Sequence, residues 1–230
     1  MIRFSTTLVS SVGKKIYMSV MGLMLSGFLL VHLVGNLTLL SPDKDPFNKY
    51  AHFLTHGVGN AIYVAELILG ALFLGHFIYG LIVQIGNWMA RPIRYEKVTD
   101  AGHTSKKTIF STTMIWTGLI IIIFLVLHLL HFKFGEIKMY EIEAGVEIRD
   151  LYSIVIAYYQ NTWQMLFYCV VMLLVGFHLA HGFWSAFQSL GMSGKRFTKF
   201  AITVGYIYAF VIGVGFFLIP LIIFLKGGTA

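Results

Sequence analysis

Five long apolar segments restrict what this chain can fold into. They cover about residues 16–40, 62–88, 109–133, 163–188 and 200–225. Each is longer than the roughly 20 residues that a helix needs to cross the hydrocarbon core of a bilayer. Of the 230 residues, 57% are hydrophobic and 12% are charged, whereas soluble domains carry about 25% charged residues. The sequence therefore predicts an all-α integral membrane protein with five transmembrane helices, folded as one membrane domain over residues 1–230.

Basic residues are distributed unevenly between the two sides that five spans define. The N-terminus and the second and fourth connections share one side, with eleven basic and two acidic residues; the other side has six basic and seven acidic residues. Because loops rich in Lys and Arg stay in the cytoplasm, we expect a cytoplasmic N-terminus and an outside C-terminus in the cytoplasmic (inner) membrane. This asymmetry suits anionic lipid headgroups and a docked partner. Nucleic-acid binding has no support, because no basic helix lies outside the loops.

Other segments carry weaker information. No small-residue cleavage site follows the first 15 residues, so we expect no signal peptide. Cys169, the single cysteine, excludes an intrachain disulfide and a cysteine-ligated iron–sulfur or zinc site. The stretch DLYSIVIAYYQ at 150–160 predicts a short helix in the headgroup layer. The fifth span has no His, Asp, Glu, Lys or Arg before Lys226, which predicts a packing helix kinked at Pro220.

Each of the first four spans contains a histidine deep in its apolar run: His32, His76, His128 and His178. An imidazole in hydrocarbon is costly, so it usually faces a bundle interior, a partner or a cofactor. A single one is best explained by a hydrogen bond inside the bundle. Four on four helices match the number that two bis-histidine haem sites require. The first four spans are therefore predicted to form a haem-binding bundle.

Depth along the helices predicts how the four histidines pair. At ~1.5 Å per residue, His32 and His128 lie ~24 and ~28 Å from the inner edge of their spans. His76 and His178 lie ~21 and ~22 Å from the outer edge. The sequence thus predicts an outer pair, His32 with His128, and an inner pair, His76 with His178, roughly 15 Å apart. His131, three residues beyond His128, is a poorer candidate.

Competing interpretations of these residues stay open. Glycines in the first four spans would make room for a flat ring, but small residues also allow helices to pack closely. Zinc or a di-iron centre is disfavoured, because Glu66 is the only carboxylate within a span. His52, His56 and His103 lie in connections, where we expect solvated or interfacial side chains.

The sequence around these histidines resembles the cytochrome b subunit of succinate dehydrogenase and fumarate reductase in its five-helix, di-haem form. Together with the number of spans, the similar stretches cover nearly the whole chain. HGFWSAFQSLG is the most specific part. The stretches are FLLVHLVGNLTLL (28–40), FNKYAHFL (47–54), TGLIIIIFLVLHLLHF (117–132) and VGFHLAHGFWSAFQSLGM (175–192).

The resemblance implies cofactors and partners. The family's axial ligands correspond to the four deep histidines, so two haem b groups are expected. A flavoprotein subunit and an iron–sulfur subunit would dock on the cytoplasmic face, and a quinone, usually menaquinone, would react in the membrane. Succinate and fumarate chemistry would belong to a partner subunit, and this chain would transfer electrons. Ser19 corresponds to a family position that contacts a propionate of the inner haem. Gly176 stands where some relatives have a glutamate used in transmembrane proton transfer.

Quinone chemistry needs a protonatable group that water can reach, because two protons accompany two electrons. Near the outer pair, Glu66 is the main candidate, with Tyr50, His52 and Tyr63 as neighbours in the sequence. Alternatively, Glu66 is an interfacial carboxylate that extends to water or pairs with Lys49. An inner quinone site near Trp184 and Ser185 also stays open.

Two other functions share part of this pattern. A di-haem anchor of another quinone-linked dehydrogenase would use the same histidines without the fourth-span motif. A histidine-based proton-relay protein would need polar residues along a continuous path, and the first and third spans are very apolar.

Overall fold

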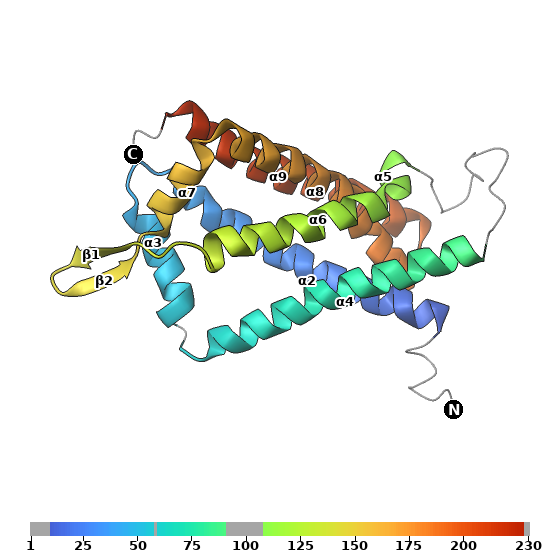
Figure 1. The fold of residues 1–230 in the computed structure, drawn as a ribbon. Coiled ribbons are helices and arrows are strands. Elements are labelled where there is room, and N and C mark those ends of the chain that lie inside the picture. Colours follow the sequence, from blue (N-terminus) through green and yellow to red (C-terminus); the bar gives the residue numbers. More distant parts are fainter. Residues whose placement is uncertain (1–9, 58, 91–107, 228–230) are drawn as a thin grey trace.

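The computed structural model describes residues 10–57, 59–90 and 108–227, and this part of the chain is mostly helix (Figure 1). Five segments are long and apolar enough to cross a membrane. The predicted all-α membrane fold with five spans is therefore confirmed, and the apolar flanks of these helices contact lipid. The segments are α2 with its 3-10 extension η1 (Ser11–Leu37, Thr38–Leu40), α4 (Ala61–Met89), α6 with the π-helical turn η3 (Met114–His128, Leu129–Lys133), α8 (Thr162–Ser189) and α9 (Lys195–Leu225).

Three helix boundaries differ from those predicted, and one of them is the start of the fifth span at Lys195 instead of about residue 200. The first span begins at Ser11, because the side chain of Ser10 accepts a hydrogen bond from the Gly13 amide at 2.9 Å and caps the helix. The third span was expected to be continuous from residue 109, and this is wrong. A capped single turn, α5 (Ile109–Thr112), comes first, and Thr113, with φ −99° and ψ 1°, separates it from α6.

The connections after the first and third spans contain more regular structure than expected. The first one forms a short helix, α3 (Asp45–His52), followed by a π-helical turn, η2 (Phe53–Gly57). The longer one forms an antiparallel hairpin of β1 (Met139–Glu143) and β2 (Val146–Arg149), in which Gly145 has a φ of 80° at the turn. It ends in α7 (Leu151–Tyr159), which confirms the predicted short helix.

Helices α8 and α9 form the closest packing in the bundle. A Cβ added to Gly213 would lie 3.0 Å from the Cα of Gly176, so the two backbones nearly touch there. By contrast, α4 packs against α2 and has no buried residue in the isolated chain. Figure 1 shows α4 standing away from the α8–α9 pair, with α2 and α6 between them. The other three histidine-bearing helices, α2, α4 and α6, are thus more loosely packed than α8 and α9.

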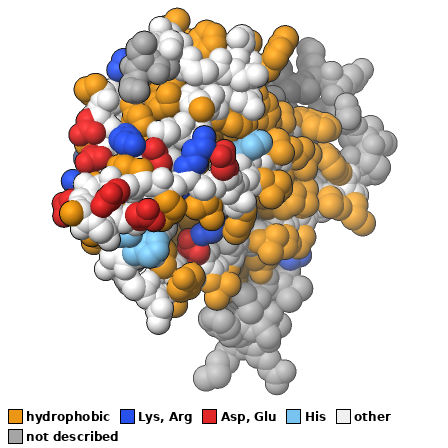
Figure 2. Space-filling view, turned by 60° about the vertical axis from the view of Figure 1, so that its left-hand side comes forward, with side chains coloured by type: hydrophobic (Ala, Val, Ile, Leu, Met, Phe, Trp, Pro, Cys, Tyr) orange, Lys and Arg blue, Asp and Glu red, His pale blue; other side chains and the backbone are white. Residues whose placement is uncertain are grey.

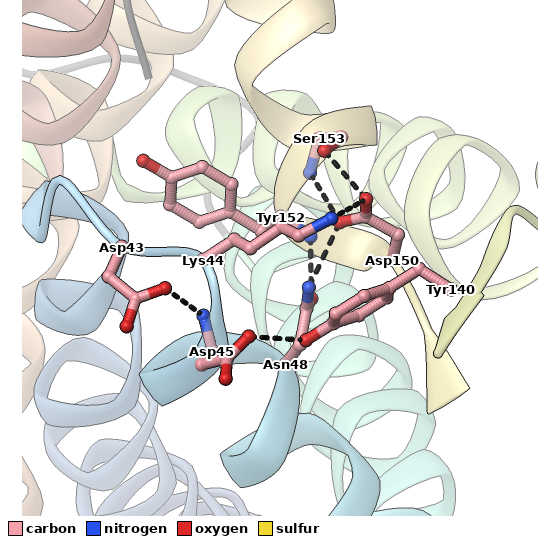
Figure 3. Close-up of polar contacts among 8 residues, drawn as sticks. All are labelled: Asp43, Lys44, Asp45, Asn48, Tyr140, Asp150, Tyr152 and Ser153. Carbon is pink, nitrogen blue, oxygen red and sulfur yellow. Dashed lines mark hydrogen bonds and ion pairs between the residues drawn. The ribbon is translucent and has the colours of Figure 1, made fainter. Parts of the chain in front are cut away.

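A polar cluster joins the first and third connections to one another (Figure 3). The side chain of Asn48, 0% exposed, donates to Asp150 Oδ1 at 2.9 Å and accepts from the Tyr152 amide at 2.8 Å. Burial by itself raises the pKa of Asp150, but hydrogen bonds from Asn48, Ser153 and Lys44 outweigh it, and the pKa lies below its ordinary value. Figure 2 shows acidic and basic side chains gathered at this end, with hydrophobic side chains along the flank.

Candidate functional site

The structure brings the four deep histidines together as the same two pairs that helix depth predicts. The rings of His32 and His128 have centroids 6.0 Å apart, with planes at 88°. The rings of His76 and His178 have centroids 6.2 Å apart, with planes at 72°. All four side chains are half-buried among α2, α4, α6 and α8. Each pair therefore consists of facing imidazoles from two different helices.

The separation between the two levels can be counted along three helices. Each of these helices carries one of the four histidines. Each also has a second residue that contacts a histidine of the other pair, so the two residues mark the two levels. Gly22 lies against His76, Gly118 against His178, and the Tyr168 hydroxyl lies 3.4 Å from His128 Nδ1. Ten residues, or ~15 Å, separate the members of each couple: Gly22 and His32, Gly118 and His128, and Tyr168 and His178.

Hydrogen bonds fix the tautomers of the inner pair. His76 Nδ1 lies 3.0 Å from the carbonyl oxygen of Met18, which can only accept, so Nδ1 carries the proton. His178 Nδ1 lies 3.0 Å from the hydroxyl of Thr117. That hydroxyl donates to the carbonyl of Thr113 or Met114, and it therefore accepts from His178. Both neutral rings are left with an unprotonated Nε2, as a metal ligand requires.

Aromatic side chains surround the outer pair. Phe28 stacks on His32 with centroids 5.2 Å apart, and Phe216 lies 5.7 Å away. His128 is flanked by Phe124 and Phe132 at 5.6 and 5.3 Å. The 3.4 Å contact with Tyr168 is longer than the contacts at the inner pair. The outer imidazoles thus sit in a more apolar setting with weaker hydrogen bonding.

These residues fit a haem at each pair. A metal ion bound at about 2.0–2.1 Å by one nitrogen of each imidazole puts opposed ring centroids about 6.3 Å apart, once the ring radius is included. The observed centroid separations are 6.0 and 6.2 Å. Within the described residues no three His, Cys, Asp or Glu side chains form a metal site. Two imidazoles per metal are the number of protein ligands needed when a macrocycle supplies the other donors.

The glycines of the first four spans divide into two groups. No atom lies within 4 Å of a Cβ added at Gly27 or Gly70, so these positions are open. Others are closed by neighbours, as Gly75 is by Met21 Sδ at 2.8 Å. A Cβ at Gly176 would lie 3.3 Å from the Cα of Gly213. Position 176 therefore has no room for a glutamate side chain, and it serves the α8–α9 crossing.

The quinone candidates have different neighbours. Glu66 forms an ion pair with Lys133 in η3. The predicted alternative, a pair with Lys49, is wrong, because Lys49 pairs with Asp45 at 3.7 Å.

The other candidates near the outer pair lie in different surroundings. Tyr50 packs against Gly35 of α2, and the side chain of Tyr63 is 68% exposed. His52 stacks on His56 and lines a cavity of about 270 Å³ beside the hairpin.

The remaining predicted residues lie on the inner half of the bundle. Ser19 is buried on α2, next to the Met18 carbonyl that contacts His76. Trp184 is 3% exposed and its ring contacts His181 at 5.1 Å. The Ser185 hydroxyl donates to the carbonyl of Gly182 at 3.3 Å. His103 lies outside the described residues.

Sequence reasoning missed the groups that hold the imidazoles. Thr117 and Tyr168 are the polar side chains nearest the ligand candidates, and the third partner is the backbone carbonyl of Met18. The sequence contains a pattern that could have indicated the two side chains, Thr117 and Tyr168. Each is a hydroxyl-bearing residue within an apolar span, ten or eleven residues before a deep histidine on the same helix.

Comparisons with protein-family models, with curated proteins and with solved structures found no match for this chain.

Proposed function

We propose that this chain is the di-haem cytochrome b membrane anchor of a succinate:quinone oxidoreductase. The observation that carries the proposal is the pairing of four imidazoles on four helices, with centroids 6.0 and 6.2 Å apart. These separations suit one iron between each pair. The stretches at 28–40, 47–54, 117–132 and 175–192, which resemble the cytochrome b family, narrow the proposal to this class of complex.

Each side chain has a defined part in this proposal. His32 and His128 hold the outer haem, and His76 and His178 hold the inner one. When bound, the two haems supply one-electron carriers between the partner subunits and the membrane quinone. The Met18 carbonyl and the Thr117 hydroxyl keep the proton on Nδ1 of the inner imidazoles, which orients the rings and raises their basicity.

The succinate chemistry belongs to partners under this proposal. A flavoprotein and an iron–sulfur subunit dock on the cytoplasmic face, close to the inner pair. The cytoplasmic side is the one with the excess of Lys and Arg. Ser19 is buried next to Met18, at the level of the inner pair. In this proposal its hydroxyl contacts a propionate of the inner haem.

Glu66 is the proposed proton carrier for quinone on the outer side. Its carboxylate pairs with Lys133, which lies five residues after His128 at the end of the same span. Both side chains are about a third exposed, at 37% and 39%, so water reaches them. Glu66 lies ten residues before His76 on α4, which is the spacing of the two histidine levels, so a carboxylate exposed to water at this depth can deliver the protons that quinone reduction requires.

The proton-relay alternative is less well supported. Between the two histidine levels, α2 and α4 contribute Phe28 and Phe73, whose rings meet edge to face at 6.3 Å. Phenyl rings cannot carry a proton, so this contact does not continue a relay between the pairs. The alternative of another quinone-linked anchor uses the same site and differs only in its partners.

The test is affinity purification of the tagged chain from its native membrane, followed by identification of its partners and by succinate addition. We expect a flavoprotein and an iron–sulfur protein in equal amounts, and reduction of the haem absorption bands by succinate. Haem bands that hydrogen, formate or another donor reduces, and succinate does not, would contradict the succinate assignment while leaving the haem sites intact.

A further inference from the structure

His52 and His56 form a stacked pair that the proposed haem sites do not use. Their ring centroids are 4.5 Å apart, and their planes differ by 14°. His52 ends α3 and His56 lies in η2. Residues four apart in a helical segment lie on the same face. Two imidazoles at this spacing are a recurrent bidentate arrangement for zinc.

The hydroxyl of Thr55 fixes the tautomer of His56. Thr55 Oγ1 donates to the carbonyl of Ala51 at 3.0 Å or of His52 at 3.2 Å. It also lies 2.8 Å from His56 Nδ1. When its one proton goes to either carbonyl, Thr55 accepts from the Nδ1–H of His56. In that tautomer the Nε2 of His56 is unprotonated in the neutral ring, and this atom is available to a metal ion.

The surroundings leave space for an ion and carry balanced charge. His52 lines a cavity of about 270 Å³ between the α3–η2 segment and the hairpin. Lys49 and Glu143 contribute opposite charges to this cavity, and Lys49 is also paired with Asp45 at 3.7 Å. His56 and Thr55 are exposed, so an ion can reach the pair from water.

We propose that His52 and His56 bind a divalent transition metal ion, Zn²⁺ or a similar imidazole-seeking ion, on the side of the hairpin. The pair supplies two ligands and water supplies the others, because no third His, Cys, Asp or Glu joins a metal site within the described residues. Such a site is weaker than a four-ligand structural zinc site. It discriminates against Mg²⁺ and Ca²⁺, which prefer oxygen ligands.

The experiment is a Zn²⁺ titration of the full chain in lipid nanodiscs, in which calorimetry measures the binding. Mg²⁺ is the control ion. We expect one saturable Zn²⁺ site per chain and no Mg²⁺ binding. His52→Gln and His56→Gln should each weaken Zn²⁺ binding by about tenfold or more. Thr55→Val should weaken it by roughly tenfold, since it removes the group that orients His56, whereas Thr55→Ser should retain it. His131→Gln is the matched control at a histidine outside the pair.

Three results would overturn the proposal: no saturable Zn²⁺ binding, unchanged affinity in both pair variants, or an equal loss in His131→Gln. Each variant is checked by its thermal unfolding midpoint, so that a loss of zinc binding is separated from a loss of fold. Because the side chain of Thr55 is exposed, we expect its Val and Ser variants to fold, and their Zn²⁺ affinities can be compared directly. Haem content is measured on the same samples, because imidazole pairs without haem also offer nitrogen ligands to Zn²⁺.

Discussion

Replacing Thr117 by Val should raise the midpoint potential of the inner haem alone. The hydroxyl of Thr117 accepts the Nδ1–H of His178 at 3.0 Å and is buried, at 4% exposure. This hydrogen bond makes the imidazole a stronger donor and so favours the oxidised iron. Valine has nearly the same shape, so the change removes the bond without opening a cavity.

The size of the shift follows from the energy of one hydrogen bond. A neutral hydrogen bond contributes about 1 kcal/mol net, and a tenfold change in a one-electron equilibrium, ~1.4 kcal/mol, corresponds to about 59 mV. The bond can therefore account for a rise of at most about 40 mV. Loss of the partner also leaves a buried N–H unsatisfied, which lowers haem retention at that site by about 10- to 100-fold in affinity.

The assay is a spectroscopic redox titration of both haems in the wild type, Thr117→Val and Thr117→Ser. The serine variant keeps a hydroxyl and should behave like the wild type. An upward shift confined to one haem in Thr117→Val supports the assignment of His178 as its ligand. Unchanged potentials and haem content in Thr117→Val, or a shift of the other haem, would refute the reasoning.

Three further predictions concern other parts of the molecule. Gly176→Leu should lower the unfolding midpoint by about 3–10 °C, because a side chain there meets the α9 backbone at 3.3 Å. Gly27→Ala, at an open position, should not change it. Because its folded pKa is depressed below the unfolded value of about 3.9, Asp150 stabilises the fold fully above that pH and progressively less as the pH falls through the folded value. Thermal unfolding between about pH 6 and pH 2 should show this loss in the wild type and lack it in Asp150→Asn; identical acid profiles would contradict the assignment. Glu66→Gln should preserve both haem spectra and lower quinone-dependent electron transfer by about 100-fold; an unchanged rate would favour the inner site near Trp184.

The spans and the histidine pairing could be predicted because both depend on local regularities. Hydropathy over about 20 residues identifies a crossing helix, and a rise of 1.5 Å per residue sets the depth of each side chain. Neither step requires knowledge of which helices touch. The pairing of His32 with His128 and of His76 with His178 therefore follows from counting along the chain.

The groups around the histidines could not be predicted in the same way. Whether Thr117 faces His178, or Tyr168 faces His128, depends on the rotation of each helix about its axis. The partner of Glu66 depends on which neighbouring segment ends beside α4, and this is η3 with Lys133. Lys49 is closer along the chain but pairs within α3. Tertiary packing decides each of these contacts.

Local interruptions were missed for a different reason. Thr113 lies in an apolar stretch that hydropathy treats as continuous, although the capping box of Thr108 and Ser111 gives the preceding turn its own start. The hairpin around Gly145 alternates polar and apolar residues over only a few positions, a weak pattern beside the long spans.

The most direct test of the central claim is the haem content and ligation of the purified chain. A pyridine haemochrome assay and low-temperature electron paramagnetic resonance should show two low-spin, bis-imidazole b haems per chain. His32→Ala and His128→Ala should each remove one haem, and His76→Ala and His178→Ala should each remove the other. One haem per chain would contradict one of the two pairs, and a haem-free chain would contradict the electron-transfer function as a whole.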